Sequence, residues 1–223
     1  MKLISTDMGQ VLQLIVMEEV RPLSGLYLPR LLHAIWERYE FVSGPKDFEA
    51  DIANGAKFKT GHLQIEGRDI AIQELGFYND GVVVNALTTD DADLVTDNML
   101  EWITREFKLR PIQTHKQRRH SSGLIVELDA SVDTALTKFS TVAQIFSTAL
   151  KAAYGVSYDY NVNTISFAVD PTVAPRLFNT KFQIERRVEI PFSANRYISH
   201  APLKTDAHVR VLEYIERILA SGG

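Results

Sequence analysis

The sequence predicts an α+β protein made of two pseudo-repeated halves, each with the order β-α-β(3-4)-α, an antiparallel sheet and helices packed on one face. Two observations lead to this prediction. Segments in which apolar and polar residues alternate, as in half-buried strands, are interleaved with segments in which apolar residues recur every three or four positions, as in helices. In addition, the stretch 63–107 returns in altered form at 182–219, which indicates an internal duplication.

The two copies are aligned by a Gln-Ile-Glu sequence with an arginine close behind it. Gln64 and Gln183 open these sequences and are 119 residues apart. Thr89 and Thr205 are 116 residues apart, and the cores of the helices that follow are 112 apart. The last change in offset, four residues, is close to one helical turn, so the buried face keeps its phase. We therefore predict a first half at 1–110, a basic connector at 111–121 and a second half at 122–223.

The first half begins with a strand and a helix. The apolar residues of 8–20 fit either structure, but the β-branched run at 14–16 favours a buried strand. A helix follows around Pro29, which is tolerated in the first helical turn, and it ends before Gly44-Pro45. Its core-facing positions are Leu28, Leu31, Leu32, Ile35, Tyr39 and Val42.

Three strands and a second helix complete the first half. The strands are predicted at 57–66, 69–75 and 82–85. The turn signal Asn79-Asp80-Gly81 joins the last two in an antiparallel meander. Thr88 or Thr89 then caps a helix. The buried stripe of that helix is Val95, Met99, Trp102, Ile103 and Phe107.

A short apolar strand at 124–128 opens the second half, and the longest predicted helix follows it. Ser131 can cap this helix, and Gly155 can end it because glycine readily adopts the left-handed conformation found at helix C-termini. Thr205 caps a final helix. Between the two helices, strands are predicted at 156–160, 165–169, 181–190 and 196–200.

Composition restricts the class of protein more than it identifies a function. The chain is 45% apolar, enough for a sizeable core, and its net charge of −4 argues against binding a polyanion over the whole surface. It has no cysteine, which excludes disulfides, thiolate metal sites and cysteine nucleophiles. No apolar run approaches the roughly 20 residues of a membrane span, and the first residues do not resemble a secretory signal. We expect a cytoplasmic protein without membrane contact.

The sequence contains no motif of a known catalytic or cofactor site. It has no P-loop, no Gly-x-Ser-x-Gly elbow and no dinucleotide-binding glycine pattern. Its histidines lack metal-site spacing; His200 and His208 flank the last strand-to-helix turn but are expected at surface or capping positions. Asp90, Asp91 and Asp93 could coordinate Mg²⁺, but acids also stabilise a helix start, and that interpretation is favoured. We assign no catalytic residue, cofactor or metal, and leave open whether the chain is an enzyme.

The segment 105–120 is the most basic part of the chain. It has six lysines and arginines against one glutamate, a composition that suits contact with nucleic-acid phosphates. A solvated linker explains the same composition and is the favoured interpretation. The candidate phosphate-binding residues are Lys108, Arg110, Lys116, Arg118 and Arg119.

The helix at 131–154 has one apolar face with a repeating 3-4 spacing and one polar face with little charge. Charge-poor surface is typical of helices that become covered, here by the other half of the chain or by a second chain. The predicted core positions are Val132, Ala135, Leu136, Phe139, Val142, Ala143, Phe146, Ala149, Leu150 and Ala153. The predicted protein-interface residues are Thr137, Ser140, Thr141, Gln144, Ser147 and Thr148.

These features favour a non-catalytic protein-interaction subunit or adaptor that self-associates through the 131–154 helix. One alternative is a nucleic-acid-binding module that uses the 105–120 segment. A second alternative is a small-molecule-binding protein with a pocket between sheet and long helix, lined by Tyr158, Tyr160 and Phe167. The expected partner is another protein or a second copy of the chain.

Overall fold

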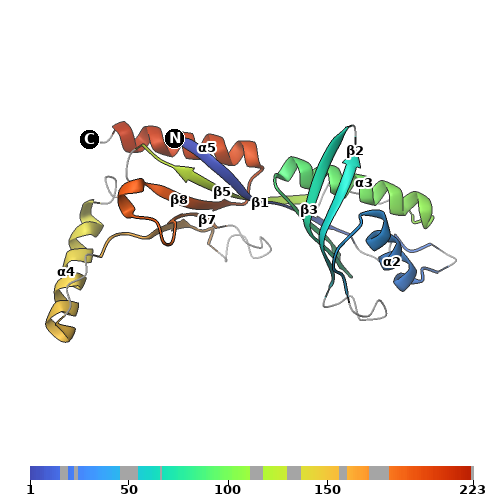
Figure 1. Cartoon of the computed structure of the whole chain (residues 1–223), viewed down its shortest axis with the longest axis horizontal. Helices are drawn as coiled ribbons and strands as arrows, with labels where there is room; N and C mark the ends of the chain where they lie inside the picture. Colours follow the sequence, from blue (N-terminus) through green and yellow to red (C-terminus); the bar gives the residue numbers. More distant parts are fainter. Residues whose placement is uncertain are drawn as a thin grey trace. The chain divides into compact units, whose positions relative to one another are not determined.

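The computed structural model of the chain confirms the α+β class (Figure 1). It describes residues 1–15, 20–22, 25–45, 55–65, 67–110, 118–129, 137–155, 160–170 and 181–221. Within these ranges it contains four α-helices and eight strands. None of the described helices is both long enough and apolar enough to span a membrane.

The elements follow one another along the chain as strands, helices and one short 3₁₀ turn. They are β1 (Lys2–Leu14), α2 (Leu28–Arg38), β2 (Ala56–Ile65), β3 (Arg68–Tyr78), β4 (Gly81–Ala86), α3 (Thr89–Glu106), β5 (Arg118–Glu127), α4 (Thr137–Tyr154), β6 (Thr164–Phe167), β7 (Phe182–Arg186), η4 (Phe192–Ala194), β8 (Arg196–Ala201) and α5 (Thr205–Ser221).

The strands form one antiparallel sheet in the order β2-β3-β4-β1-β5-β8-β7-β6. β2 and β3 form a hairpin whose turn contains Gly67 at φ +76°, a left-handed conformation that glycine adopts at little cost. β1 pairs with β4. β7 lies between β6 and β8, with Ile184 opposite both Ile165 and Ser199.

The chain divides into two compact units. The α2/α3 unit comprises Thr6–Ser122 and Leu203–Thr205, and the α4/α5 unit comprises Met1–Ser5, Gly123–Pro202 and Asp206–Gly223. Strands β1 and β5 therefore contribute residues to both units.

Apolar side chains from both helices and from β2, β3 and β4 form the core of the α2/α3 unit. The amphipathic α2 buries Leu31, Leu32 and Ile35, as its sequence spacing predicts. Val42, predicted on the same face, follows the end of the helix at Arg38 and is 76% exposed. α3 packs against β3 and β4 through Val95, Met99 and Ile103, among others. Burial of each side chain of this size contributes roughly 1.5–3 kcal/mol to the free energy of unfolding, so these apolar stripes stabilise the packing of α2 and α3 in this unit.

Gly9 allows α3 to begin directly on β1. A side chain at position 9 would place its first carbon 2.0 Å from the carbonyl carbon of Thr88, so the approach requires glycine. Thr88 is the N-cap of α3, because its Oγ1 accepts a hydrogen bond from the N–H of Asp91 at 3.1 Å. The predicted threonine cap is confirmed.

The α4/α5 unit has a smaller core. α5 lies along one face of β5, β8 and β7 (Figure 1). Its main cluster of buried apolar side chains is Leu124, Val126, Leu128, Ile184, Tyr197, Leu212 and Leu219.

Arg186 is a charged residue of this unit that is only 3% exposed. Its Nε and Nη1 donate hydrogen bonds to the carbonyl oxygens of Val162 at 3.2 Å and Phe192 at 3.1 Å. Its guanidinium also lies 4.3 Å from the ring centre of Phe192. Burial of the charge is tolerated because these acceptors replace water, so Arg186 ties two loops to β7.

Three local predictions differ from the structure or fall outside it. β1 begins at Lys2, earlier than the predicted position 8, because its first residues join the sheet although they lack an apolar alternation. β7 ends at Arg186 rather than at 190, since the chain turns away and Glu189 is left-handed at φ +66°. Ser131 and nearly all of the predicted strand 156–160 lie outside the described residues.

His208 was predicted at the surface or at a helix cap, but it is fully buried. Its Nε2 lies 2.9 Å from the hydroxyl oxygen of Ser199, whose proton is donated to the carbonyl oxygen of Gln183 at 2.8 Å. Ser199 must therefore accept from His208, which makes His208 the neutral Nε2–H tautomer. The sequence pattern missed this pair because its members meet only when α5 packs on β8.

Burial, followed by the charge of His200, lowers the pKa of His208 to about 4. In the unfolded chain the ordinary value of 6.5 applies, so between pH 6.5 and about 4 the unfolded state binds a proton that the folded state does not. We predict that the free energy of unfolding falls by roughly 2–3 kcal/mol across this window, at about 1.4 kcal/mol per pH unit, and then levels off.

Urea unfolding at a series of pH values checks this prediction. His208→Gln keeps a donor toward Ser199 without a titrating group, and it should flatten the profile between pH 6.5 and 4. His200→Gln, the matched control, should leave most of the slope. An unchanged profile in His208→Gln would contradict the assignment.

Candidate functional site

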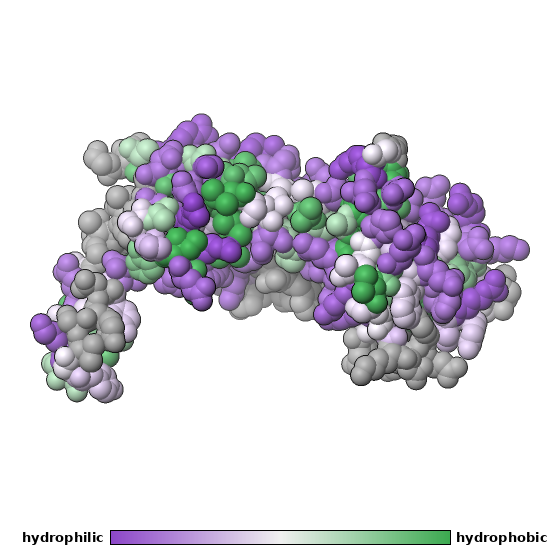
Figure 2. Space-filling view, viewed as in Figure 1, coloured by the Kyte–Doolittle hydropathy of each residue, from purple (hydrophilic) through white to green (hydrophobic). Residues whose placement is uncertain are grey.

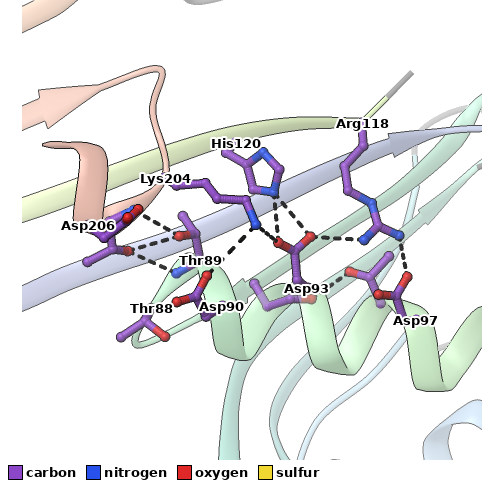
Figure 3. Close-up of polar contacts among 12 residues, drawn as sticks. Thr88, Thr89, Asp90, Asp93, Asp97, Arg118, His120, Lys204 and Asp206 are labelled. Carbon is purple, nitrogen blue, oxygen red and sulfur yellow. Dashed lines mark hydrogen bonds and ion pairs between the residues drawn. The ribbon is translucent and has the colours of Figure 1, made fainter. Parts of the chain in front are cut away.

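The described polar residues form a dense network around Asp93, near the N-terminus of α3 (Figure 3). α3 begins at a threonine cap followed by acidic residues, so its first two turns carry carboxylates on different sides of the axis. Asp93 is the one turned inward, with a side chain only 15% exposed. It is the centre from which the rest of the network can be described.

Three cationic or donor groups converge on the Asp93 carboxylate. Arg118 Nη1 is 2.9 Å from Oδ1, His120 Nε2 is 3.0 Å from Oδ2, and Lys204 Nζ is 2.7 Å from Oδ2. Arg118 also donates to Asp97 Oδ1 at 2.6 Å and to Gln13 Oε1 at 2.9 Å. The network joins the start of β5 and the turn before α5 to α3.

These contacts determine the protonation state of Asp93. Partial burial alone would raise its pKa, but hydrogen bonds from Lys204 and His120 and the positive charges of both outweigh burial, and the pKa lies below its ordinary value of 3.8. Asp93 is therefore ionised at neutral pH, and its carboxylate holds the basic side chains of Arg118, His120 and Lys204 in place.

Thr89 and Thr205 lie beside this network and bond to each other reciprocally. The N–H of Thr89 donates to Oγ1 of Thr205 at 3.0 Å, and the N–H of Thr205 donates to Oγ1 of Thr89 at 2.9 Å. Thr89 is the first residue of α3, and Thr205 is the first residue of α5. Each hydroxyl thus satisfies an N–H that a helix start leaves without a partner.

The acidic residues at the start of α3 have different surroundings. Asp93 contacts three basic side chains, Asp91 pairs with Arg68, and Asp90 is 68% exposed. Among the described residues, no group of three or more potential metal ligands comes together.

The candidate phosphate-binding residues are placed at opposite ends of α3. Lys108 and Arg110 are exposed and follow its C-terminal end, whereas Arg118 binds Asp93 and Asp97 near its beginning. The 13 residues between Asp93 and Glu106 correspond to about 20 Å of helix. Arg119 is half-buried, and Lys116 lies outside the described residues. The described members therefore do not form one continuous basic patch.

The predicted interface residues lie on α4. Thr141, Gln144 and Thr148 are exposed, and Ser147 is half-buried. Ser147 Oγ donates to the carbonyl oxygen of Ala143 at 2.9 Å and accepts from the N–H of Tyr160 at 3.0 Å. Thr137 and Ser140 belong to the first turn of α4, for which the structure describes only the backbone.

The apolar face of α4, predicted as core, is exposed instead. Val142 is 59% exposed, Ile145 65%, Phe146 51% and Tyr154 75%. Green and white side chains of α4 accordingly lie on the surface in Figure 2. Phe146 makes an edge contact with Tyr160 at 4.8 Å between ring centres. Val142 and Phe146 were predicted as core positions, whereas Ile145 and Tyr154 were not. Periodicity places residues on one side of a helix but does not say what covers that side.

The residues predicted to line a small-molecule pocket are only partly described. Tyr160 contacts Phe146 of α4, while Phe167 is 61% exposed and contacts Phe182 of β7 at 6.1 Å between ring centres. Tyr158 lies outside the described residues. These contacts bring Tyr160, but not Phe167, against the long helix.

No protein-family model and no curated protein matches the chain. Any functional conclusion therefore depends on the geometry of its own residues.

The network residues His120 and Lys204 were not singled out as site residues from the sequence, whereas Thr205 was predicted as a helix cap. Arg118 and His120 are two residues apart on a strand and so share a face, which was a usable signal. Their partner Asp93 belongs to a different element, and local spacing does not reveal that pairing.

We predict that Asp93→Asn lowers the free energy of unfolding by about 1–3 kcal/mol, because it removes a partly buried carboxylate from Arg118, His120 and Lys204. Since the folded pKa is the lower one, this contribution is complete above about pH 4 and is lost as the pH falls through that folded value. Urea unfolding at pH 7 and at pH 3 measures both effects.

Asp90→Asn is the matched control, because Asp90 is 68% exposed and its contact with Lys204 is 3.8 Å long. It should change the free energy of unfolding by about 0.5 kcal/mol or less. Equal effects of the two substitutions would show that the network does not stabilise the fold.

Proposed function

We propose that the protein is a non-catalytic interaction subunit that self-associates through α4, with the apolar face of the helix as the central contact. The observation that carries the proposal is the composition and exposure of 141–154. Nine of these fourteen residues are apolar, only Lys151 is charged, and none is buried. Exposed apolar surface of this extent marks an interaction site.

The spacing of the apolar residues suits a paired helix. Val142, Phe146, Ala149 and Ala153 recur at intervals of four, three and four, the 3.5-residue period of a coiled-coil seam. An 18-residue helix is about 27 Å long, and an isolated helix of this length is only marginally stable in water. Burial of this stripe against a second helix would supply the missing stabilisation.

A second copy is the partner that the charge distribution favours. Self-association brings identical residues together, so a charged seam would repel itself, and the α4 seam has no charge. Lys151 lies on the opposite side of the helix from Val142. The predicted polar residues Thr141 and Thr148 border the stripe and can lose water at less cost than charged residues.

The pseudo-repeat of the two halves also belongs to this proposal, and the order of strands supports it. The strand order is β2-β3-β4-β1 followed by β5-β8-β7-β6. The second half therefore repeats the order of the first in reverse, with β5, β6, β7 and β8 as the counterparts of β1, β2, β3 and β4. Thr89 and Thr205, aligned by the sequence offset, make reciprocal hydrogen bonds, so the two aligned residues have the same role at the two helix starts. The Gln-Ile-Glu copies fit less well, because Ile65 ends β2 and Ile184 lies within β7.

The pseudo-repeat makes α2 the counterpart of α4. Each follows the first strand of its half. The apolar face of α2 is buried through Leu31, Leu32 and Ile35, whereas that of α4 is exposed. The apolar face of α2 is thus covered and that of its counterpart is not, and we propose that a second copy covers α4.

The test compares two glutamate substitutions on opposite faces of α4. Val142→Glu places a charge in the proposed seam and should weaken dimerisation about tenfold or more, because a buried valine contributes roughly 1.5 kcal/mol or more. Gln144→Glu adds the same charge on the polar face and should have a much smaller effect. Sedimentation equilibrium over a range of concentrations measures both dissociation constants.

A wild-type chain that remains monomeric at high micromolar concentration would overturn the proposal. Weaker association in Gln144→Glu than in Val142→Glu would instead place the contact on the polar face. Circular dichroism of each variant confirms that the loss does not come from unfolding.

A further inference from the structure

Residues at the start of α2 and the end of α3 line an open cavity of about 530 Å³, within the size range of small-molecule sites. We infer that this cavity binds a nucleoside phosphate. The inference is independent of α4, because every lining residue belongs to the α2/α3 unit. The lining residues are Gly25, Leu26, Tyr27, Arg30, Glu106, Phe107 and Lys108.

Two cationic side chains of this cavity are available to a ligand. Arg30 and Lys108 are exposed, and in the part of the chain that the structure describes neither side chain makes a hydrogen bond or ion pair. Several other basic residues of this unit are already paired with carboxylates. Arg118 and Lys204 bind Asp93, and Arg68 binds Asp91. A guanidinium and an ammonium at one cavity are the usual donors to a phosphate group.

The helix start adds to the positive potential of the cavity. Tyr27 is the N-cap of α2 and provides no side-chain cap, and the first turn contains no acidic residue. The partial positive charge of the helix N-terminus is therefore not neutralised within the helix, and it adds to the charge of Arg30.

Lys108 holds an unfavourable backbone conformation at this site. It follows the C-cap Phe107 at φ +52°, and the N–H of Leu109 bonds to the carbonyl oxygen of Thr104 at 3.0 Å, a chain reversal at which glycine is usual. A side chain in this conformation costs about 1 kcal/mol. Lysine at position 108 therefore places an ammonium group at the cavity and lowers the stability of the fold.

The remaining lining residues fit the nucleoside rather than phosphate alone. Tyr27 is 66% exposed as a residue, and Phe107 makes an edge contact with Trp102 at 6.0 Å between ring centres. A base stacked on an aromatic ring gains about 1–3 kcal/mol. Glu106 can accept hydrogen bonds from sugar hydroxyls or from an amino group of the base.

Binding of ADP to the full-length wild-type chain, measured by isothermal titration calorimetry at low salt, tests the inference. We expect ADP to bind at least tenfold more tightly than inorganic phosphate. A short single-stranded oligonucleotide forms a second arm: competition with ADP would identify the ligand as a nucleotide unit within a strand, and binding of ADP alone would identify a free nucleotide.

Two variants separate binding from folding. Lys108→Gly removes the ammonium and relieves the left-handed lysine, so it should weaken ADP binding at least tenfold while the melting temperature stays the same or rises. Arg30→Gln should weaken binding by a similar factor. Arg105→Gln, an exposed arginine of α3 outside the cavity lining, is the matched control and should bind normally.

Three results would overturn the inference. They are the absence of ADP binding at millimolar concentration, equal affinities for ADP and phosphate, and ADP binding that survives both Lys108→Gly and Arg30→Gln.

Discussion

The reciprocal hydrogen bonds between Thr89 and Thr205 fix the point at which α3 and α5 begin. Gly9 brings the α3 start onto β1, and the Asp93 carboxylate adds the ion pairs of Arg118 and Lys204 to the same place. Hydrogen bonds are directional and short-ranged, so these two bonds restrict which residue begins each helix. The Asp93 network therefore holds the start of β5 and the residues before α5 against α3.

The strongly periodic elements could be predicted from the sequence. The stripe of α2, the threonine cap of α3 and the glycine that ends α4 all follow from local rules, and Gly155 does adopt φ +72° there. His208 and Arg118 could not be placed in this way. Each is held by residues of other elements, and local spacing does not specify which strands and helices meet.

The long helix shows the same limit in another form. The spacing of its apolar residues indicates that they share one side of the helix, but it does not identify the residues that pack against that side. In α2, cover comes from the core of its own unit. In α4, residues such as Val142 and Ile145 remain more than half exposed, an arrangement that is unfavourable for a helix in water and favourable for association. The charge-poor composition of the helix agrees with this interpretation.

The central claim is that a second copy covers the apolar face of α4, and amide hydrogen exchange measured at several protein concentrations tests it most directly. Covering the helix suppresses its local opening, so exchange within Thr137–Tyr154 should slow as the concentration rises, while α3 exchanges at a constant rate. Exchange in α4 that is fast and independent of concentration would contradict the claim.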